Sequence, residues 1–170
     1  MSAPPIIHGF PPLIGENPRL LILGSMPSVA SLDAAQYYAH PRNQFWPILG
    51  QLTAAGPGLG YPERCRRLTE SGMALWDVLQ SCRRRGSLDS DIQADDRQCN
   101  DIAGLLRAHP TLIHIYCNGG AAAALFRKHI LPGLPAGYPH TQLPSTSPAN
   151  ARLNAAEKLE IWRAHLQPWL

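Results

Sequence analysis

Residues 20–28 read LLILGSMPS, and residues 40–46 read HPRNQFW. The short apolar run at 20–23 is typical of a buried strand in a parallel sheet, and the small residues and proline that follow it predict a loop. Open α/β sheets bind their ligands at the carboxyl ends of such strands. We therefore expect a site at the loop that begins with Gly24.

Strands and helices alternate along the rest of the chain. The apolar patterns predict strands at 20–23, 73–79, 112–116 and around 140–143, and helices at 43–52, 62–71, 100–108, from the Gly119-Gly120 turn to 129, and at 150–166. This alternation predicts a three-layer α/β/α sandwich around a central, mostly parallel sheet of four to five strands.

The first 18 residues contain five prolines and show no periodicity. They predict an irregular N-terminal arm over residues 1–18, which either packs on the body or frays. Residues 19–170 are then expected to form a single domain, because a chain of this length can bury one substantial core.

The composition is that of an ordinary folded protein, with 45% apolar and 16% charged residues. No apolar run approaches the ~20 residues of a membrane span, and the N-terminus lacks a basic region followed by an apolar stretch. We therefore expect a cytoplasmic protein without membrane association.

Thirteen of the fifteen basic residues are arginine, and the net charge is +3. The planar arginine fork suits phosphate contacts, although genomic base composition explains the same bias. The four cysteines are separated by sixteen or seventeen residues and include no Cys-x-x-Cys pair. This spacing favours ordinary thiols in a reducing compartment, so we expect no metal and no cofactor.

The two segments quoted first resemble the uracil-DNA glycosylase superfamily, in which a strand ends in Gly-x-x-Pro and is followed by His-Pro-x-Asn-x-Phe-Trp. Residues 143–152, LPSTSPANAR, resemble its C-terminal DNA-intercalation motif, where a Ser-Pro turn precedes a helix. Together with Tyr37-Tyr38, these segments are closest to the hypoxanthine-DNA (deoxyinosine) glycosylases, which are related to the mismatch-specific uracil-DNA glycosylases. The resemblance spans roughly residues 19–166 and implies the uracil-DNA glycosylase-like form of the α/β/α sandwich.

The first loop departs from these relatives at one position. The mismatch-specific enzymes carry an asparagine two residues after the first glycine, where it positions the attacking water, and other uracil enzymes supply an aspartate. This chain has Met26 in that place, and a thioether cannot orient a water nucleophile. Asn43 is our catalytic candidate instead, because its amide can both accept from water and donate to a base or sugar oxygen. The alternative is that Asn43 caps the helix that follows it.

The resemblance also implies a pocket for an extruded base. Its expected residues come from the strand ends and the aromatic segment: Gly24, Ser25, Met26, Pro27, Tyr38, His40, Phe45, Asp77 and Asn118. Asp77 could accept a hydrogen bond from an N–H of a purine-like base, or could pair with the neighbouring arginines. Asn118 precedes two glycines and a helix, an arrangement that suits a ligand or anion but also an ordinary turn.

Aromatic side chains can compensate the stacking that an extruded base loses. Tyr37, Tyr38, Phe45 and Trp46 are the candidates, with core packing as the alternative. His40 resembles the family histidine, but Pro41 beside it indicates loop shaping as much as proton transfer.

DNA contacts are expected from the second motif. Ser145, Thr146 and Ser147 at a helix N-terminus suit a phosphate, Pro148, Ala149 and Asn150 suit a wedge in the space left by the flipped nucleotide, and Arg152 could add a phosphate contact. The alternative is a turn in which Ser147 caps the helix. The arginines at 83–85 could follow the DNA backbone or lie in a solvated loop.

From this resemblance we expect a monomeric, monofunctional DNA glycosylase of base excision repair that acts on damaged DNA. It would remove hypoxanthine first, with uracil and xanthine as further substrates, by base flipping and hydrolysis of the N-glycosidic bond. No lysine lies in the motif loops, so no lyase step is expected. The alternatives are a mismatch-specific uracil/thymine-DNA glycosylase and a non-catalytic lesion- or nucleotide-binding module of the same fold. All of them require the Asn43 segment and the Ser-Pro turn to meet at one cleft.

Overall fold

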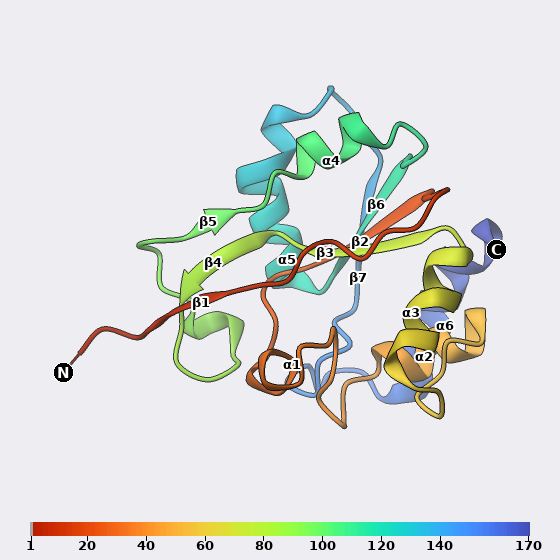
Figure 1. Ribbon diagram of the computed structural model, residues 1–170, viewed down its shortest axis with the longest axis horizontal. Coiled ribbons are helices and arrows are strands. Elements are labelled where there is room, and N and C mark those ends of the chain that lie inside the picture. The colour runs from red at the N-terminus through yellow and green to blue at the C-terminus, as the bar shows by residue number, and fades with distance from the viewer. Residues whose placement is uncertain (1) are drawn as a thin grey trace.

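The computed structural model describes residues 2–170 and is built on a four-stranded parallel sheet (Figure 1). The strand order is β3-β2-β6-β7, with bounds Met73–Asp77, Leu20–Gly24, His114–Asn118 and His140–Leu143. The four strands lie where the apolar runs predict them, and β2 occupies the centre with β3 and β6 on either side. The predicted α/β/α sandwich around a parallel sheet is therefore confirmed.

The alternation of side chains along β2 divides the core into two halves. Leu20 and Ile22 point into one apolar cluster, whereas Leu21 and Leu23 point into the other, and all four are essentially inaccessible to solvent. Because both faces of β2 are buried, its sequence is an uninterrupted run of apolar residues.

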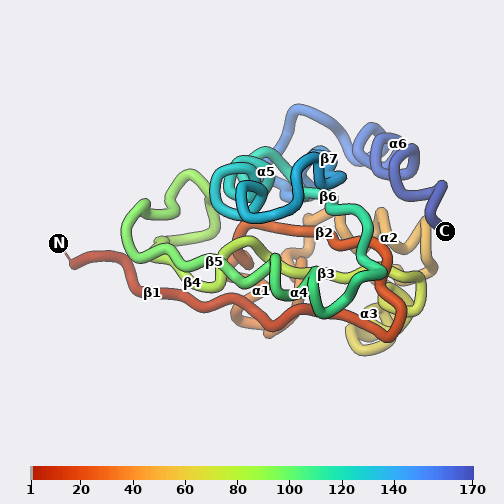
Figure 2. Tube along the Cα trace, turned by 90° about the horizontal axis from the view of Figure 1, so that it is seen from above, coloured from red at the N-terminus to blue at the C-terminus, as the bar shows by residue number. Residues whose placement is uncertain are grey.

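Helices cover both faces of the sheet. The first cluster is closed by α2 (Phe45–Thr53), α3 (Tyr61–Glu70) and α6 (Ala155–Leu166), and the second by α4 (Ile102–Ala108) and α5 (Gly120–Leu125), which continues as a π-helical turn to Ile130. Figures 1 and 2 show α2, α3 and α6 gathered toward the end of the molecule that holds the C-terminus.

A second, smaller sheet was not predicted. The apolar run at 73–79 does not stay in one strand: β3 ends at Asp77, and the chain continues as β4 (Leu79–Arg83), which pairs antiparallel with β1 (Ile6–His8) and β5 (Gln98–Cys99). The chain turns because the Val78 and Leu79 N–H groups donate to the carbonyls of Gly24 and Ser25, past the end of β2. Part of the proline-rich N-terminal segment is thereby packed on the body, near the N-terminal end in Figure 2.

Two helices differ from the sequence prediction. Residues 29–34 form a short helix, α1 (Val29–Ala34), whose first turn is capped by the Ser28 hydroxyl. The final helix begins at Ala155 rather than at residue 150, because Asn154 and Glu157 form a capping box there. Residues 144–154 are consequently a long irregular turn.

Within residues 2–170, none of the helices has the length and apolar character needed to cross a lipid bilayer.

Candidate active site

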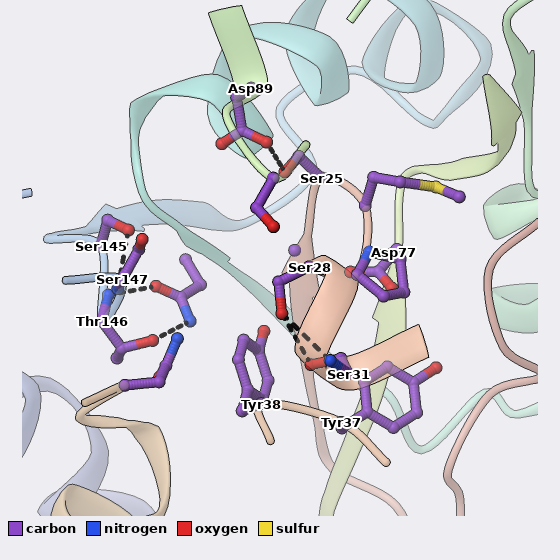
Figure 3. A pocket seen from close by; sticks show the side chains of 16 residues that line it. Ser25, Ser28, Ser31, Tyr37, Tyr38, Asp77, Asp89, Ser145, Thr146 and Ser147 are labelled. Carbon is purple, nitrogen blue, oxygen red and sulfur yellow. Dashed lines mark hydrogen bonds between the residues drawn. The ribbon is translucent and has the colours of Figure 1, made fainter. Parts of the chain in front are cut away.

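A cavity of about 90 Å³ lies where the carboxyl ends of the four parallel strands meet (Figure 3). Most of the residues expected to form a base pocket line it: Gly24, Ser25, Met26, Pro27, Tyr38, Asn43, Asp77 and Asn118, together with Ser145, Thr146 and Ser147 of the second motif. Segments more than 100 residues apart in the sequence therefore share one cavity, as the sequence interpretation requires.

Thr146 joins the motif segments. Its backbone carbonyl accepts a hydrogen bond from the Gln44 N–H at 2.9 Å. The Asn118 amide donates to the Thr146 hydroxyl at 3.0 Å and accepts from the Thr146 N–H at 3.0 Å. Asn118 is thus a clamp between the end of β6 and the turn, because both polar atoms of its side chain bind Thr146.

Gly119 allows the turn to approach β6 this closely. Its backbone has φ 97° and ψ 168°, a conformation open essentially only to glycine, and a Cβ on it would lie 2.8 Å from the Ser145 Cβ. We expect Gly119→Ala to lower the free energy of unfolding by roughly 2–3 kcal/mol, measured by urea denaturation. Gly58→Ala is the matched control, since a Cβ at Gly58 meets nothing within 4 Å. Equal stability of the two variants would show that residue 119 tolerates a side chain.

Asn43 lines the cavity and also binds the backbone at the start of α2. Its Oδ1 accepts the Phe45 N–H at 2.9 Å and so satisfies a backbone donor at the start of α2. This hydrogen bond assigns the oxygen to the helix and leaves the amide nitrogen available as a donor at the cavity, which Asn43 lines.

Asp77 is the buried carboxyl group of the cavity. The residue is only 4% exposed, and its Oδ2 atom has no hydrogen-bond partner in the described part of the chain. The pKa of Asp77 is raised to about 7, chiefly by burial and also by the negative charge of Asp89, while the Arg84 guanidinium opposes the shift. The alternative of an ion pair with the arginines at 83–85 is wrong, since those side chains bind elsewhere.

The arginines at 83–85 donate hydrogen bonds to other parts of the protein, Arg84 from a buried position and Arg85 from an exposed one. Arg84 is 2% exposed and donates to the carbonyls of Gly86 and Pro27. Arg83 binds Asp96 and the Pro4 carbonyl, and Arg85 donates to the Ser2 carbonyl.

The aromatic residues divide between the cavity and the core. Tyr38 lines the cavity, whereas Phe45 and Trp46 are buried in the first apolar cluster. Tyr37 belongs to both, since it borders the cavity but is buried in the same cluster. Phe45 stacks on Tyr38 with ring centroids 4.0 Å apart. The expectation that Phe45 contacts a base directly is therefore wrong, because the Tyr38 ring packs against it.

His40 does not line the cavity. Its Nδ1 accepts the Arg42 N–H at 3.1 Å, which shapes the loop before Asn43. His40 therefore shapes the loop, and the prediction that it belongs to the base pocket is wrong.

The segment after β4 forms a wall of the cavity that sequence reasoning missed. Ser87 and Asp89 line it, and the Ser25 hydroxyl donates to the Asp89 carboxylate at 2.6 Å (Figure 3). Ser28 and Ser31 of the α1 region complete the lining. The segment after β4 shows no periodic pattern that would have predicted its place at the cavity. The one local feature that sets it apart is its serine- and aspartate-rich composition after Gly86.

A wider groove of about 650 Å³ opens beside the cavity and shares Asp89, Asn118, Ser145 and Ser147 with it. Three of the expected DNA-binding residues line only this groove: Ala149, Asn150 and Arg152. Pro148 lines neither space.

The turn is not held by a helix N-terminus. Since α6 begins at Ala155, Ser147 cannot cap it, and the helix-terminus phosphate site expected at Ser145–Ser147 is wrong in that respect. The buried Lys158 ammonium fixes the turn instead, donating to the carbonyls of Ser147 and Asn150 at 3.2 and 2.8 Å.

The family model described as "Uracil DNA glycosylase superfamily" matches residues 11–166. The chain belongs to the uracil-DNA glycosylase superfamily. Its similar relatives include a protein named hypoxanthine DNA glycosylase from Methanosarcina acetivorans, 38% identical over 94% of this chain and 97% of the relative. A protein of the same name from Methanosarcina barkeri is 36% identical over 85% of this chain and 89% of the relative.

The fold agrees with a solved member. A solution NMR structure of a Methanosarcina acetivorans protein, provisionally assigned as a uracil DNA glycosylase, superposes with a TM-score of 0.80 at 36% identity. The superposition covers 96% of this chain and 98% of that structure. The superfamily is therefore established by sequence and by fold together.

Proposed function

We propose that this protein is a monofunctional DNA glycosylase that removes deaminated bases, with hypoxanthine as its main substrate. The cavity would receive the base of a nucleotide rotated out of the duplex, and the 650 Å³ groove would hold the flanking DNA. The observation that carries the proposal is the buried Asp77 carboxyl group in a cavity formed by both superfamily motifs.

Deamination changes the hydrogen-bonding groups on one edge of a base, and a carboxylate can distinguish the two forms. The ring nitrogen next to the altered carbon has a lone pair in adenine and cytosine, but becomes a lactam N–H in hypoxanthine and uracil. An ionised Asp77 accepts that N–H and is repelled by the lone pair of the undamaged base. Guanine also has a lactam N–H, so its 2-amino group must be excluded by another part of the pocket.

The same charge favours purines over pyrimidines. A carboxylate on the lactam N–H raises the basicity of the purine ring, which assists protonation of the ring and departure of a neutral base. Uracil leaves as an anion, and a nearby carboxylate opposes that charge. We therefore place hypoxanthine and xanthine ahead of uracil.

Asn43 would position the water that attacks the sugar. Its amide nitrogen can donate to the water oxygen, and the second lone pair of Oδ1 can accept a water proton while the first serves Phe45. Tyr38, supported by Phe45, offers a stacking face beside the base.

Groups on the turn would hold the DNA backbone. Ser145 and Ser147 lie at the cavity, and the exposed Arg152 borders the groove, where its guanidinium can bind a phosphate. The prediction that Thr146 contacts DNA is wrong, because Thr146 is 1% exposed and its polar groups bind Asn118 and Gln44. We further propose that the enzyme acts as a cytoplasmic monomer with a single domain, which includes β1 of the N-terminal segment because β1 pairs with β4. Size-exclusion chromatography with light scattering tests the oligomeric state.

The substrate preference is tested with duplexes that carry one deoxyinosine, deoxyxanthosine or deoxyuridine, and with undamaged controls that include deoxyguanosine. Released bases are separated by chromatography, and abasic sites are cleaved with alkali. We expect hypoxanthine to be released fastest and undamaged strands to stay intact. A preference for uracil or thymine in mismatches would favour the mismatch-specific alternative. Binding without release of any base would favour a non-catalytic module.

A further inference from the structure

Rotating a nucleotide out of a duplex leaves an empty space in the base stack. Enzymes and architectural proteins fill such spaces with an apolar side chain inserted between base steps. The turn expected to provide this wedge is poorly suited to it, because Ala149 offers a single methyl group, Leu153 is partly buried, and Pro148 lines neither the cavity nor the groove. A wedge in this groove therefore needs a larger and more exposed apolar side chain.

Leu88 is such a group. It borders the groove and is 51% exposed, one of the few large apolar side chains of the protein that face solvent. It belongs to the segment after β4, whereas Ala149 and Leu153 of the turn line the same groove. Leu88 thus reaches the DNA-binding space from a different segment than the family turn.

The backbone around Leu88 is fixed on both sides. Before it, the Ser87 hydroxyl accepts the Val29 N–H at 2.9 Å. After it, the Asp89 carboxylate accepts the Ser25 hydroxyl at 2.6 Å, as Figure 3 shows. The Leu88 carbonyl itself accepts the Asp91 N–H at 3.0 Å.

These anchors connect Leu88 to the base pocket. Val29 and Ser25 belong to the loop and helix that follow β2, and buried Arg84 adds a third link by donating to the Pro27 carbonyl at 2.6 Å. A side chain inserted into DNA must be held rigidly relative to the pocket that receives the flipped base. The hydrogen bonds on either side of Leu88 provide that rigidity.

We propose that Leu88 is the apolar wedge that enters the base stack and occupies the space left by the extruded nucleotide. The inference rests on the proposed function and adds to it the segment that drives extrusion. Asp89, next to Leu88, is bonded to a residue of the cavity, so the same segment contacts the DNA stack and borders the extruded base.

Two substrates separate insertion from other roles of Leu88. In one duplex deoxyinosine pairs with deoxycytidine, and in the other it faces a tetrahydrofuran abasic analogue, where no pairing opposes extrusion. We expect Leu88→Ala to lower single-turnover release from the paired duplex about tenfold or more, and to lower the ratio of paired to unpaired rates. Leu88→Met should restore both, since it keeps apolar bulk.

Ile113→Ala is the matched control. Ile113 is 49% exposed and precedes β6, at the opposite end of the strand from the cavity. An equal loss on both substrates, or no loss, for Leu88→Ala would overturn the wedge. Thermal melting of each variant checks that the fold is kept.

A fluorescence measurement of base extrusion tests the wedge independently of base release. A 2-aminopurine placed beside deoxyinosine brightens when its neighbour leaves the stack. If the wild-type protein raises the 2-aminopurine fluorescence and Leu88→Ala abolishes that rise, the wedge is supported. This holds even if no base is released, an outcome that would overturn only the proposed function. A fluorescence rise that is the same with Leu88→Ala as with the wild type would overturn the wedge alone. The wedge would also be overturned if the wild-type protein produced no fluorescence rise.

Discussion

Replacing Asn43 by alanine is expected to lower the single-turnover rate of hypoxanthine release by about a hundredfold or more. The substitution removes the amide that we place on the attacking water, and the loss of one such positioned group typically costs 10²–10³ in rate. It also removes the acceptor for the Phe45 N–H at the start of α2, which should lower the free energy of unfolding by about 1 kcal/mol. Quench-flow kinetics and urea denaturation measure the two effects.

Asn43→Ser separates catalysis from capping. A serine hydroxyl can accept the Phe45 N–H two residues on, as Asn43 does, but it lacks the amide donor. We expect Asn43→Ser to be as stable as the wild type and nearly as inactive as Asn43→Ala. Wild-type activity in Asn43→Ser would reduce Asn43 to a structural residue at the start of α2.

Asp77 should control the pH dependence of excision. Because its pKa is raised to about 7 by burial, the ionised form that accepts the lactam N–H is lost below neutral pH. We expect kcat/KM for deoxyinosine to rise with pH through about 7 and to fall about tenfold per pH unit below about 6. Asp77→Asn keeps a neutral acceptor, so its kcat/KM should no longer fall at acidic pH. The value of kcat/KM that Asp77→Asn reaches above pH 7 should be about 10- to 100-fold lower than that of the wild type. A wild-type profile that falls as the pH rises through 7 would mean that the neutral carboxyl is the active form.

The same carboxyl group should cost stability at high pH. A raised pKa in the folded state means that the contribution of Asp77 is fully present below about pH 4 and is lost as the pH rises through about 7. The stability of Asp77→Asn relative to the wild type should therefore increase by roughly 3–4 kcal/mol between pH 4 and pH 8, at about 1.4 kcal/mol per unit of pKa. Urea denaturation across this range measures it. A constant difference would contradict a strongly raised pKa.

The elements that the sequence predicts well are those in which a single signal dominates. Strand β2 is a run of four apolar residues ended by Gly24, and its two buried faces leave no other arrangement in an α/β protein. The strand ends then bring Asp77 and Asn118 to one edge of the sheet, so the position of the site follows from the order of the strands.

The start of the final helix could have been predicted. Asn154 and Glu157 have the spacing of a capping box, a stronger start signal than the apolar periodicity that suggested residue 150. With that start, the turn from 144 to 154 becomes a separate element, and Ser147 is no longer a helix cap.

Other features depend on tertiary contacts that local patterns do not contain. The run at 73–79 is apolar throughout, yet it divides at Val78 because that residue's N–H finds the Gly24 carbonyl. Arg84 is buried because two backbone carbonyls from separate loops surround it, while its sequence neighbours indicate a solvated surface. Phe45 and Tyr38 are both aromatic, and only their packing shows which one reaches the cavity.

We propose that the Asn43 segment, Asp77 and the Ser145–Ser147 turn together hold one deaminated base outside the duplex. A crystal structure of Asn43→Ser bound to a deoxyinosine duplex tests it most directly, because the substrate should survive in that variant. We predict hypoxanthine in the cavity, with its N1 within hydrogen-bond distance of an Asp77 oxygen and the turn against the DNA backbone. A base that stays stacked in the duplex, or that enters the cavity with its lactam edge turned away from Asp77, would contradict the account.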